Sequence, residues 1–346
     1  EKLSKRIIIT GGGAPGASGI ISAIKNNSDN FIFSCDAKKD VIGRQLAHSF
    51  FTVPLGTAEN YIDALLQNCI SNGIQHIIPI TTKELGPLSL NKSAFEKAGI
   101  KISISSAESI ALANDKGELL SYLEEKGLEV PAFKICKTVS DFKEAAIDLG
   151  YPQNKFVFKP CISNGSRGFR IVNDRLDKSD HLFNFKPNQT EIDYKEAVQI
   201  LKSKKFPALV LMEHLPGDEY SVDCFISDGK ICFVIPRRRD EMRAGISTKG
   251  TIVNDPKIIN YCVKILELIP FEGPIGIQLK IDINGQAKLL EINPRLQGTS
   301  VACIGAGINI PLLTAANKLD DTNLRLNEGV KWGTKFIRYY SEVYYS

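Results

Sequence analysis

The sequence predicts an α/β domain with a parallel sheet at the N-terminus, followed by a longer region of the α+β class. In roughly the first hundred residues, short apolar strands alternate with helical patterns. Farther along the chain, apolar strands follow one another through tight turns and hinges. Alternating strands and helices favour a parallel sheet with right-handed crossovers, whereas consecutive strands favour hairpins.

The N-terminal region begins with a strand, a glycine-rich turn and a helix, at residues 6–10, 11–19 and 20–25. A second strand, Phe31–Asp36, ends in an acid, and further strands are expected at 49–54 and 76–80. Taken alone, this pattern is typical of a dinucleotide site in which Asp36 holds a ribose. A glycine-rich turn also occurs where two backbone segments must approach closely, so both interpretations stay open.

The first domain is expected to end near residues 105–111, after a strand at 102–104. Asn114, Asp115 and Lys116 then open a helix that runs to Lys126, because Gly127 stops it. These signals predict one domain at residues 1–109 and a second at 110–346.

A buried strand at Phe156–Pro160 ends in a single cationic residue, Lys159, and a glycine-rich loop at residues 163–168 follows at once. A lysine in an apolar strand is costly unless it meets an anion. Because backbone N–H groups of such a loop can point inward, phosphate is the expected anion. The alternative is a lysine that extends its ammonium group to solvent beside a flexible turn.

Two strands at residues 209–223 are joined by a hinge that contains Pro216 and Gly217, which is also the composition of a generic turn. Residues 236–250 then hold several arginines in what we expect to be a flexible loop. Such a loop could simply be a solvated face.

Residues 276–295 are predicted to form a hairpin that carries a metal and phosphate site. Glu291 and Asn293 are two apart on a strand, so their side chains leave the same face, and Gln278 can reach that face from the partner strand. Oxygen donors with few carboxylates suit Mg²⁺. Arg295 supplies a fork for a phosphoryl or carboxylate oxygen. The alternative is an ordinary surface ion pair between Glu291 and Arg295.

Composition excludes several classes of protein. Of the 346 residues, 43% are hydrophobic and 24% are charged. No apolar run approaches the ~20 residues that a membrane span requires. We also expect no signal peptide in the first residues given. A net charge of +4 gives no footprint for nucleic acid. The eight scattered cysteines and four isolated histidines indicate reduced thiols rather than a zinc site. We therefore expect a cytoplasmic protein that binds neither membrane nor nucleic acid.

Together, the motifs at 156–168, 209–223 and 276–295 resemble the ATP-grasp superfamily, in the branch typified by one half of the carbamoyl-phosphate synthase large chain. The resemblance covers residues 6 to about 340. It implies a Rossmann-like α/β preceding domain and an ATP-grasp fold whose two lobes, about 120–212 and about 216–346, clamp ATP. Each motif occurs once, so the chain is not a complete large chain of that enzyme.

The resemblance implies a role for individual residues. The ATP-binding residues expected are Lys116, Lys159, Gly165, Ser166, Arg167, Gly168, Glu213, His214, Leu215 and Glu219. The two lysines would contact the α- and β-phosphates, and residues 165–168 would cover the β- and γ-phosphates as a mobile lid. The backbone at residues 213–215 would face adenine, and Glu219 would bind the ribose hydroxyls.

The metal and catalytic roles follow from the same resemblance. Gln278, Glu291 and Asn293 would hold two Mg²⁺ ions, with Mn²⁺ as the alternative ion, while Arg295 stabilises the transferring phosphoryl group. A loop that places Arg243 and Lys249 beside the γ-phosphate would neutralise charge as an acyl phosphate forms.

The acceptor would be held by the same arginine-rich segment, through Arg237 and Arg239. Glu84 matches a position where an acidic residue often faces the acceptor in the family. Many relatives place an Asp just before that Glu, where this chain has Thr82 and Lys83. The alternative for Glu84 is an acid at a helix N-terminus, favoured by the helix dipole.

The activity implied is ATP-dependent ligation of a small-molecule carboxylate to an amine or ammonia through an acyl phosphate. One alternative is phosphorylation of bicarbonate or carbamate, as in carbamoyl-phosphate synthase. Two others are an NAD-dependent oxidoreductase that uses the first glycine turn, and a nucleotide-binding regulator without turnover. The complete set of Gln278, Glu291, Asn293 and Arg295 argues against the regulator. A homodimer stays open.

Overall fold

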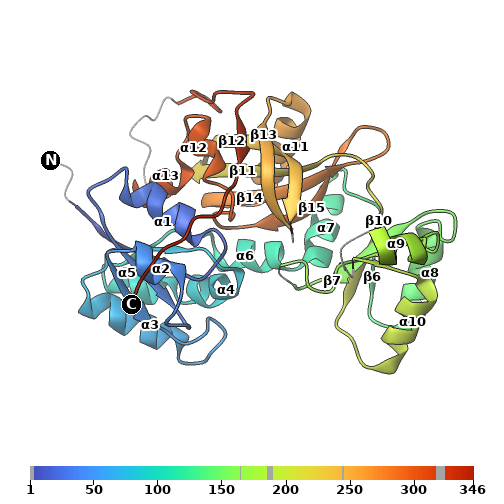
Figure 1. Ribbon diagram of the computed structural model, residues 1–346, viewed down its shortest axis with the longest axis horizontal. Coiled ribbons are helices and arrows are strands. Elements are labelled where there is room, and N and C mark those ends of the chain that lie inside the picture. Colours follow the sequence, from blue (N-terminus) through green and yellow to red (C-terminus); the bar gives the residue numbers. More distant parts are fainter. Residues whose placement is uncertain (1–3, 164, 185–189, 244, 317–323) are drawn as a thin grey trace. The chain divides into compact units, whose positions relative to one another are not determined.

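The computed structural model describes residues 4–163, 165–184, 190–243, 245–316 and 324–346, which form two compact units (Figure 1). Unit 1 contains Glu1–Ala111, Glu219–Leu279 and Glu291–Ser346, and unit 2 contains Leu112–Asp218 and Lys280–Leu290. Asn164 and Ala244, which lie in two of the predicted loops, fall outside the described residues. Every helix in the described ranges is too short or too polar to cross a bilayer.

Unit 1 begins with a five-stranded parallel sheet in the order β3-β2-β1-β4-β5. Its strands are β1 (Arg6–Thr10), β2 (Phe31–Asp36), β3 (Ser49–Thr52), β4 (His76–Pro79) and β5 (Lys101–Ile102). Its helices are α1 (Ala17–Lys25), α2 (Ile42–Leu46), α3 (Tyr61–Ser71), α4 (Thr82–Leu90), α5 (Lys92–Lys97) and α6 (Ala107–Asn114), the last of which continues into unit 2. The predicted parallel sheet is confirmed, with β5 starting one residue earlier and ending two earlier than expected.

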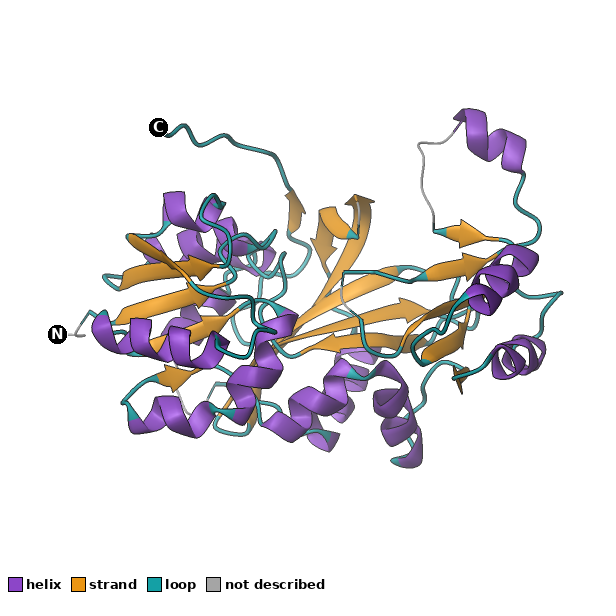
Figure 2. Cartoon of the chain, turned by 90° about the horizontal axis from the view of Figure 1, so that it is seen from below, coloured by secondary structure: helices purple, strands orange, loops and turns teal. Residues whose placement is uncertain are grey.

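Helices cover both faces of this sheet (Figure 2), which explains why its strands are apolar on both sides. Ile8 packs into the core beneath α3, α4 and α5. Ile7 and Ile9 point to the opposite face and pack with Ile20 and Ile24 of α1. Successive side chains of a strand alternate between faces, so β1 supplies both cores.

The second sheet has the order β15-β14-β11-β12-β13-β16. Its strands are β11 (Glu219–Ser227), β12 (Lys230–Arg243), β13 (Ile246–Ile252), β14 (Gly273–Ile281), β15 (Ala287–Asn293) and β16 (Lys335–Ile337). The accompanying helices are α11 (Pro256–Leu268), α12 (Ala302–Gly305) and α13 (Ile310–Ala316). Ile235, Ile252 and Leu296 share one core with α1. The domain boundary at residue 109 stays a prediction, because it separates two segments that share this core.

One expectation was wrong. The arginine-rich segment predicted as a flexible loop forms a long antiparallel hairpin of β12 and β13, in which Arg239 lies opposite Gly250. The register shifts on either side of Glu241. The segment lacks an apolar alternation, but backbone pairing and ion pairs between side chains hold it in the extended conformation.

Unit 2 contains a five-stranded sheet in the order β6-β10-β7-β8-β9. Its strands are β6 (Phe133–Cys136), β7 (Phe156–Pro160), β8 (Arg170–Val172), β9 (Glu191–Ile192) and β10 (Leu209–Glu213). Its helices are α7 (Lys116–Glu125), α8 (Val139–Asp148), α9 (Lys178–Asn184) and α10 (Tyr194–Ser203). As predicted, α7 begins at Lys116, where the Asp115 side chain caps the N–H groups of Gly117 and Glu118.

Candidate functional site

The end of β15 brings three of the predicted residues into one hydrogen-bonded row. The Asn293 Nδ2 donates to Glu291 Oε1 at 3.0 Å, and Arg295 Nη2 donates to Asn293 Oδ1 at 3.3 Å. All three side chains are partly exposed. Asn293 therefore contacts both charged groups, which is a more specific arrangement than a bare surface ion pair of Glu291 and Arg295.

The guanidinium of Arg295 is held in one orientation by its surroundings. Its Nε donates to the hydroxyl of Thr82, the first residue of α4, at 3.2 Å, and its Nη1 donates to the carbonyl of Leu296 at 2.9 Å. Burial lowers the pKa of Arg295, and the negative charge of Glu291 opposes that shift. A preoriented cation of this kind suits a developing negative charge.

The oxygen donors near this row fit Mg²⁺. Glu291 offers a carboxylate and Asn293 an amide oxygen, and Gln278 lies on β14, which neighbours β15 in the sheet. Among the described residues, no group of three or more His, Cys, Asp or Glu could hold a metal by itself. A single carboxylate with amide oxygens suits an ion that takes its remaining ligands from water and phosphate.

Glu84 is buried, unlike a residue that contacts an acceptor substrate. It lies in the first turn of α4, is only 6% exposed, and accepts hydrogen bonds from Thr10 Oγ1 at 2.9 Å and Thr81 Oγ1 at 2.5 Å. Burial raises the pKa of the Glu84 carboxyl, while these hydroxyls oppose the shift. The structure thus gives Glu84 a buried structural place, and we do not carry the acceptor role forward.

The first glycine turn packs closely against β2, α2 and the backbone of Gly298. A Cβ on Gly12 would lie 2.5 Å from Ser34 Oγ and 3.4 Å from the Gly43 backbone, and one on Gly16 would lie 2.5 Å from the Gly298 backbone. The carboxylate of Asp36 accepts from Gly13 N at 2.9 Å. Close backbone approach therefore accounts for these glycines without a bound dinucleotide.

Two of the predicted arginines have partners within the sheet. Arg237 is fully buried, and its Nε and Nη2 donate to Asp223 Oδ2 at 3.1 and 3.0 Å. The proposed substrate contact of Arg237 is corrected accordingly, because its guanidinium faces a buried carboxylate. Arg239 forms an ion pair with Glu219 and donates from Nε to Ser247 Oγ at 3.0 Å. Arg239 therefore orients the carboxylate expected to bind the ribose.

The other two cations of this hairpin are accessible. Arg243 is exposed at the end of β12. Lys249 on β13 forms a half-exposed ion pair with Glu241 at 2.8 Å. The hydrogen bond from Lys249 keeps the pKa of Glu241 below its ordinary value. Arg243 thus presents an exposed guanidinium at the end of β12.

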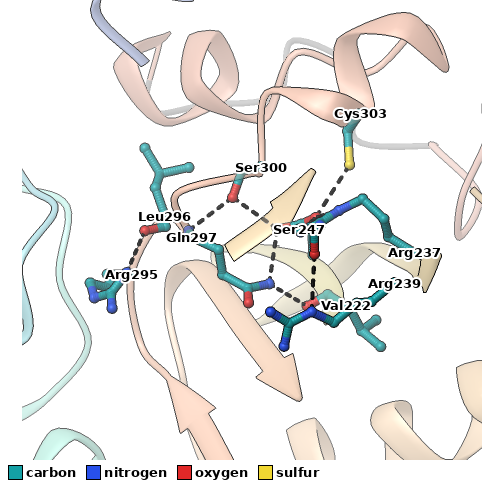
Figure 3. A network of polar contacts seen from close by, with 10 residues as sticks. Val222, Arg237, Arg239, Ser247, Arg295, Leu296, Gln297, Ser300 and Cys303 are labelled. Carbon is teal, nitrogen blue, oxygen red and sulfur yellow. Dashed lines mark hydrogen bonds and ion pairs between the residues drawn. The ribbon is translucent and has the colours of Figure 1, made fainter. Parts of the chain in front are cut away.

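Four polar residues outside the predicted sites are buried in unit 1: Asp223, Gln297, Ser300 and Cys303. Figure 3 shows Gln297, Ser300 and Cys303 together with Arg237. Asp223 is 2% exposed in an otherwise apolar strand. An acid in such a strand is a signal for a buried partner, because an unpaired charge there is very costly.

In unit 2, the two lysines predicted to bind phosphate lie on neighbouring elements, Lys116 at the start of α7 and Lys159 near the end of β7. The backbone N–H of Lys116 donates to the carbonyl of Cys161 at 2.9 Å, which packs the start of α7 on the end of β7. Lys116 Nζ donates to the carbonyl of Ser163 at 2.9 Å, and Lys159 Nζ donates to that of Leu290 at 2.8 Å. Lys116 and Lys159 are 5% and 8% exposed, and Lys116 Nζ reaches the start of the glycine loop through Ser163.

The glycine loop after β7 has an unusual backbone. Gly165, Ser166 and Gly168 all have positive φ, at 60°, 58° and 78°. A Cβ on Gly168 would lie 2.6 Å from the Pro160 ring, so glycine is required there. Arg167 is exposed at the tip of this loop.

The predicted hinge after β10 is anchored on both sides. Glu213 exchanges two hydrogen bonds with the backbone of Ala132, each at 2.9 Å. Gly217 N donates to Ile281 O at 2.9 Å, and a Cβ on Gly217 would lie 2.7 Å from the Ile281 side chain. Leu215 is buried, while burial lowers the pKa of the partly exposed His214. This hinge is more constrained than a generic turn.

Comparisons with known proteins agree with this architecture. The family described as "PylC-like, N-terminal domain" matches residues 7–103, and the family described as "ATP-grasp in the biosynthetic pathway with Ter operon" matches residues 205–335. The carbamoyl phosphate synthase arginine-specific large chain of Bacillus subtilis (strain 168) is 27% identical over 236 residues, which are 65% of this chain and 21% of the relative. The chain thus spans about a fifth of the length of the curated relatives it matches.

Among solved structures, N5-carboxyaminoimidazole synthetase from Staphylococcus aureus, complexed with ADP, has a TM-score of 0.69 at 20% identity, covering 92% of this chain and 79% of that one. The L-amino acid ligase from Bacillus licheniformis has a TM-score of 0.66 at 16% identity, covering 92% and 75%. At these identities the likeness shows the fold alone.

Proposed function

We propose, from the premise that this chain is an ATP-grasp superfamily protein with a PylC-like N-terminal domain, that it is an ATP-dependent ligase. Its reaction would join a small-molecule carboxylate to an amine or ammonia. ATP would first phosphorylate the carboxylate to an acyl phosphate with release of ADP. The amine would then attack the acyl carbon and expel inorganic phosphate.

The row of Glu291, Asn293 and Arg295 is the observation that supports this proposal most directly. It combines oxygen donors for Mg²⁺ with a guanidinium whose orientation is fixed by Thr82 and Leu296. When bound, Mg²⁺ would neutralise charge on the ATP phosphates. Phosphoryl transfer depends mainly on positioning and electrostatic stabilisation, so a site without a nucleophilic side chain suits it.

Residues of each unit are proposed to contact nucleotide. In unit 2, Lys116 and Lys159 would bind phosphates, residues 165–168 would cover them, and the backbone at residues 213–215 would face adenine. In unit 1, Glu219 would accept from the ribose hydroxyls while Arg239 holds its carboxylate. Arg243 and Lys249 would neutralise the acyl phosphate.

A second candidate is phosphorylation of bicarbonate or carbamate. The similarity to the carbamoyl phosphate synthase large chain, at 27% identity over 236 residues, favours it. Both reactions use the same phosphoryl-transfer residues, so they differ only in the acceptor.

A screen of ADP release tests both candidates. Purified protein with Mg-ATP would be incubated with amino acids and other small carboxylates, singly and in pairs with amines, with and without bicarbonate. We expect ADP release that needs both a carboxylate and an amine and does not need bicarbonate. Release with bicarbonate alone would favour the second candidate, and no ADP under any condition would contradict both.

The same screen tests the metal-binding role of Glu291. Glu291→Ala should lower ADP release by more than about 100-fold, because the metal ligand acts on the transition state. Its thermal midpoint should change little, since a partly exposed carboxylate contributes little packing. Glu267→Ala, which removes an exposed carboxylate from α11, is the matched control and should keep wild-type activity. Wild-type turnover by Glu291→Ala would contradict the assignment.

A further inference from the structure

The carboxylate of Asp223 accepts hydrogen bonds from four buried residues, Arg237, Gln297, Ser300 and Cys303, which are labelled in Figure 3. Its Oδ2 accepts from Arg237 Nε and Nη2 at 3.1 and 3.0 Å and from Cys303 Sγ at 3.5 Å. Its Oδ1 accepts from Gln297 Nε2 at 3.0 Å and from Ser300 Oγ at 2.8 Å. The two oxygens thus serve different segments, with Arg237 and Cys303 on one and the turn at residues 297–300 on the other.

Neutralising Asp223 does not by itself explain this arrangement. Arg237 already supplies the opposite charge and two hydrogen bonds to the buried carboxylate. An apolar pair of similar volume would often be at least as stable as a buried ion pair. The second oxygen, Oδ1, accepts its two hydrogen bonds from the turn at residues 297–300, so it ties this turn to β11.

The turn is also closed by bonds of its own. Gln297 N donates to Ser300 Oγ at 2.9 Å, and Ser300 N donates to Gln297 O at 3.1 Å. The Gln297 side chain packs against Gly276 of β14. A Cβ on Gly276 would be only 2.2 Å from Gln297 Cγ. Asp223 and Gly276 therefore fix the turn from two neighbouring strands.

This turn begins two residues after Arg295. The residue that separates them, Leu296, is 1% exposed, and its carbonyl accepts the hydrogen bond from Arg295 Nη1 at 2.9 Å. A shift of the turn would move this carbonyl and release one of the contacts that orient the guanidinium. Displacements of about 1 Å can cost on the order of 100-fold in rate when a reacting group must be aligned.

We infer that Asp223, acting through Gln297 and Ser300, is a positioning residue that sets the orientation of Arg295. The inference rests on the proposed role of Arg295 in phosphoryl transfer. It predicts that the two carboxylate oxygens of Asp223 are not equivalent for that role. Bonds to Oδ1 control Arg295, whereas the bond from Cys303 to Oδ2 does not.

The test compares two variants that each remove one donor from Asp223. Ser300→Ala removes one of the two donors to Oδ1, together with the acceptor of Gln297 N, whereas Cys303→Ala removes one donor to Oδ2 and leaves both bonds from Arg237. Phenylglyoxal, which modifies accessible arginines, would be added to each protein without ATP, and modification of Arg295 would be followed by peptide mass spectrometry. We expect modification of Arg295 to be several-fold faster in Ser300→Ala and unchanged in Cys303→Ala.

Two further variants separate positioning from general loosening of the fold. Gln297→Met keeps the packing on Gly276 but loses the donor to Asp223, and should also speed the modification of Arg295. Thermal unfolding of each variant would be measured in parallel. Equal modification rates in Ser300→Ala and Cys303→Ala at similar thermal midpoints would overturn the inference, as would a wild-type rate in both Ser300→Ala and Gln297→Met.

Measurements of kcat and KM form a second test. They also distinguish failure of the positioning role from failure of the proposed ligase activity. Ser300→Ala should lower kcat about tenfold with an unchanged KM for ATP, as expected for misalignment of a group that acts in the transition state. In an Arg295→Ala background it should cause no further loss, and a full additional loss there would overturn the inference. Absence of ADP release from the wild type would contradict the ligase instead, while the modification rates still decide whether Asp223 positions Arg295.

Discussion

Three arginines along β12 have very different surroundings. Arg237 is fully buried on Asp223, Arg239 is 5% exposed in an ion pair with Glu219, and Arg243 is exposed. Burial of a guanidinium is tolerated only where a carboxylate and further hydrogen bonds compensate its desolvation. The position of such carboxylates on β11 therefore determines which arginine is structural and which is accessible.

The buried carboxyl of Glu84 predicts a dependence of stability on pH. Because burial raises its pKa, the folded state binds this proton more tightly than the unfolded state does. Its contribution to stability therefore falls as the pH rises from the ordinary pKa of Glu through the raised value. Glu84→Gln removes the titration, so the variant should gain stability relative to wild type over that range.

Urea unfolding of both proteins between pH 4 and pH 8 checks this expectation. The difference in free energy of unfolding should grow with pH and then level off. Glu267→Gln, on the exposed face of α11, should show no such trend. A difference between wild type and Glu84→Gln that is the same at every pH would contradict the expectation.

At the scale of elements, the sequence pattern was informative wherever a strand is apolar. The strands β1, β2 and β7 were predicted within a residue, because burial on a sheet face imposes a local pattern. The hairpin of β12 and β13 was predicted as a loop, since its polar residues hide the pattern. Its conformation depends on Asp223 and Glu219, which belong to another strand.

The exposed Arg243 at the end of this hairpin is predicted to affect the carboxylate substrate but not nucleotide binding. Arg243→Ala should raise the KM for the carboxylate, or lower kcat, by about tenfold or more, because a cation that pairs with the carboxylate is lost. Binding of a non-hydrolysable ATP analogue, measured by calorimetry, should be unchanged. Arg238→Ala is the control, since Arg238 pairs with Asp240 on the same strand. An equal loss of nucleotide affinity would show that Arg243 serves ATP.

The glycine loop after β7 predicts a ligand-dependent change in proteolysis. Trypsin should cleave after the exposed Arg167 in the free protein, and Mg-ATP should slow this cleavage several-fold, as for other loops that close over phosphates. Gly168→Ala should lose the protection, because a Cβ there would meet the Pro160 ring at 2.6 Å.

Gly127→Ala is the matched control for that variant. Gly127 follows α7 with φ of 77°, close to the 78° of Gly168, but a Cβ on it would have nothing within 4 Å. Both substitutions should destabilise the fold by about 1 kcal/mol through the positive φ, and Gly168→Ala should cost more because its Cβ also meets the Pro160 ring. Only Gly168→Ala should change the effect of Mg-ATP on cleavage, and equal protection in both variants would argue against the lid.

At the scale of the whole molecule, the sequence motifs were sufficient to predict the fold class but not the partners of single residues. The resemblance rests on the order of the motifs along the chain, which a sequence displays directly. The bond from Lys159 to Leu290 joins residues 131 apart, and that from Arg295 to Thr82 joins residues 213 apart. Such contacts depend on how distant segments pack. For the same reason the network around Asp223 had no sequence signal beyond one acid in an apolar strand.

The proposed ATP-binding residues predict how nucleotide stabilises the protein. A ligand that binds only the folded state at 100 times its Kd adds about 2.7 kcal/mol to stability, so Mg-ATP should raise the thermal midpoint by several degrees. NADH should not raise it. Lys159→Ala should lower the shift caused by ATP both with Mg²⁺ and with EDTA, because its ammonium would contact phosphate directly. Glu291→Ala should lower it only with Mg²⁺, because its carboxylate would act through the metal. A larger shift with NADH than with ATP, or wild-type shifts in both variants, would contradict the nucleotide site.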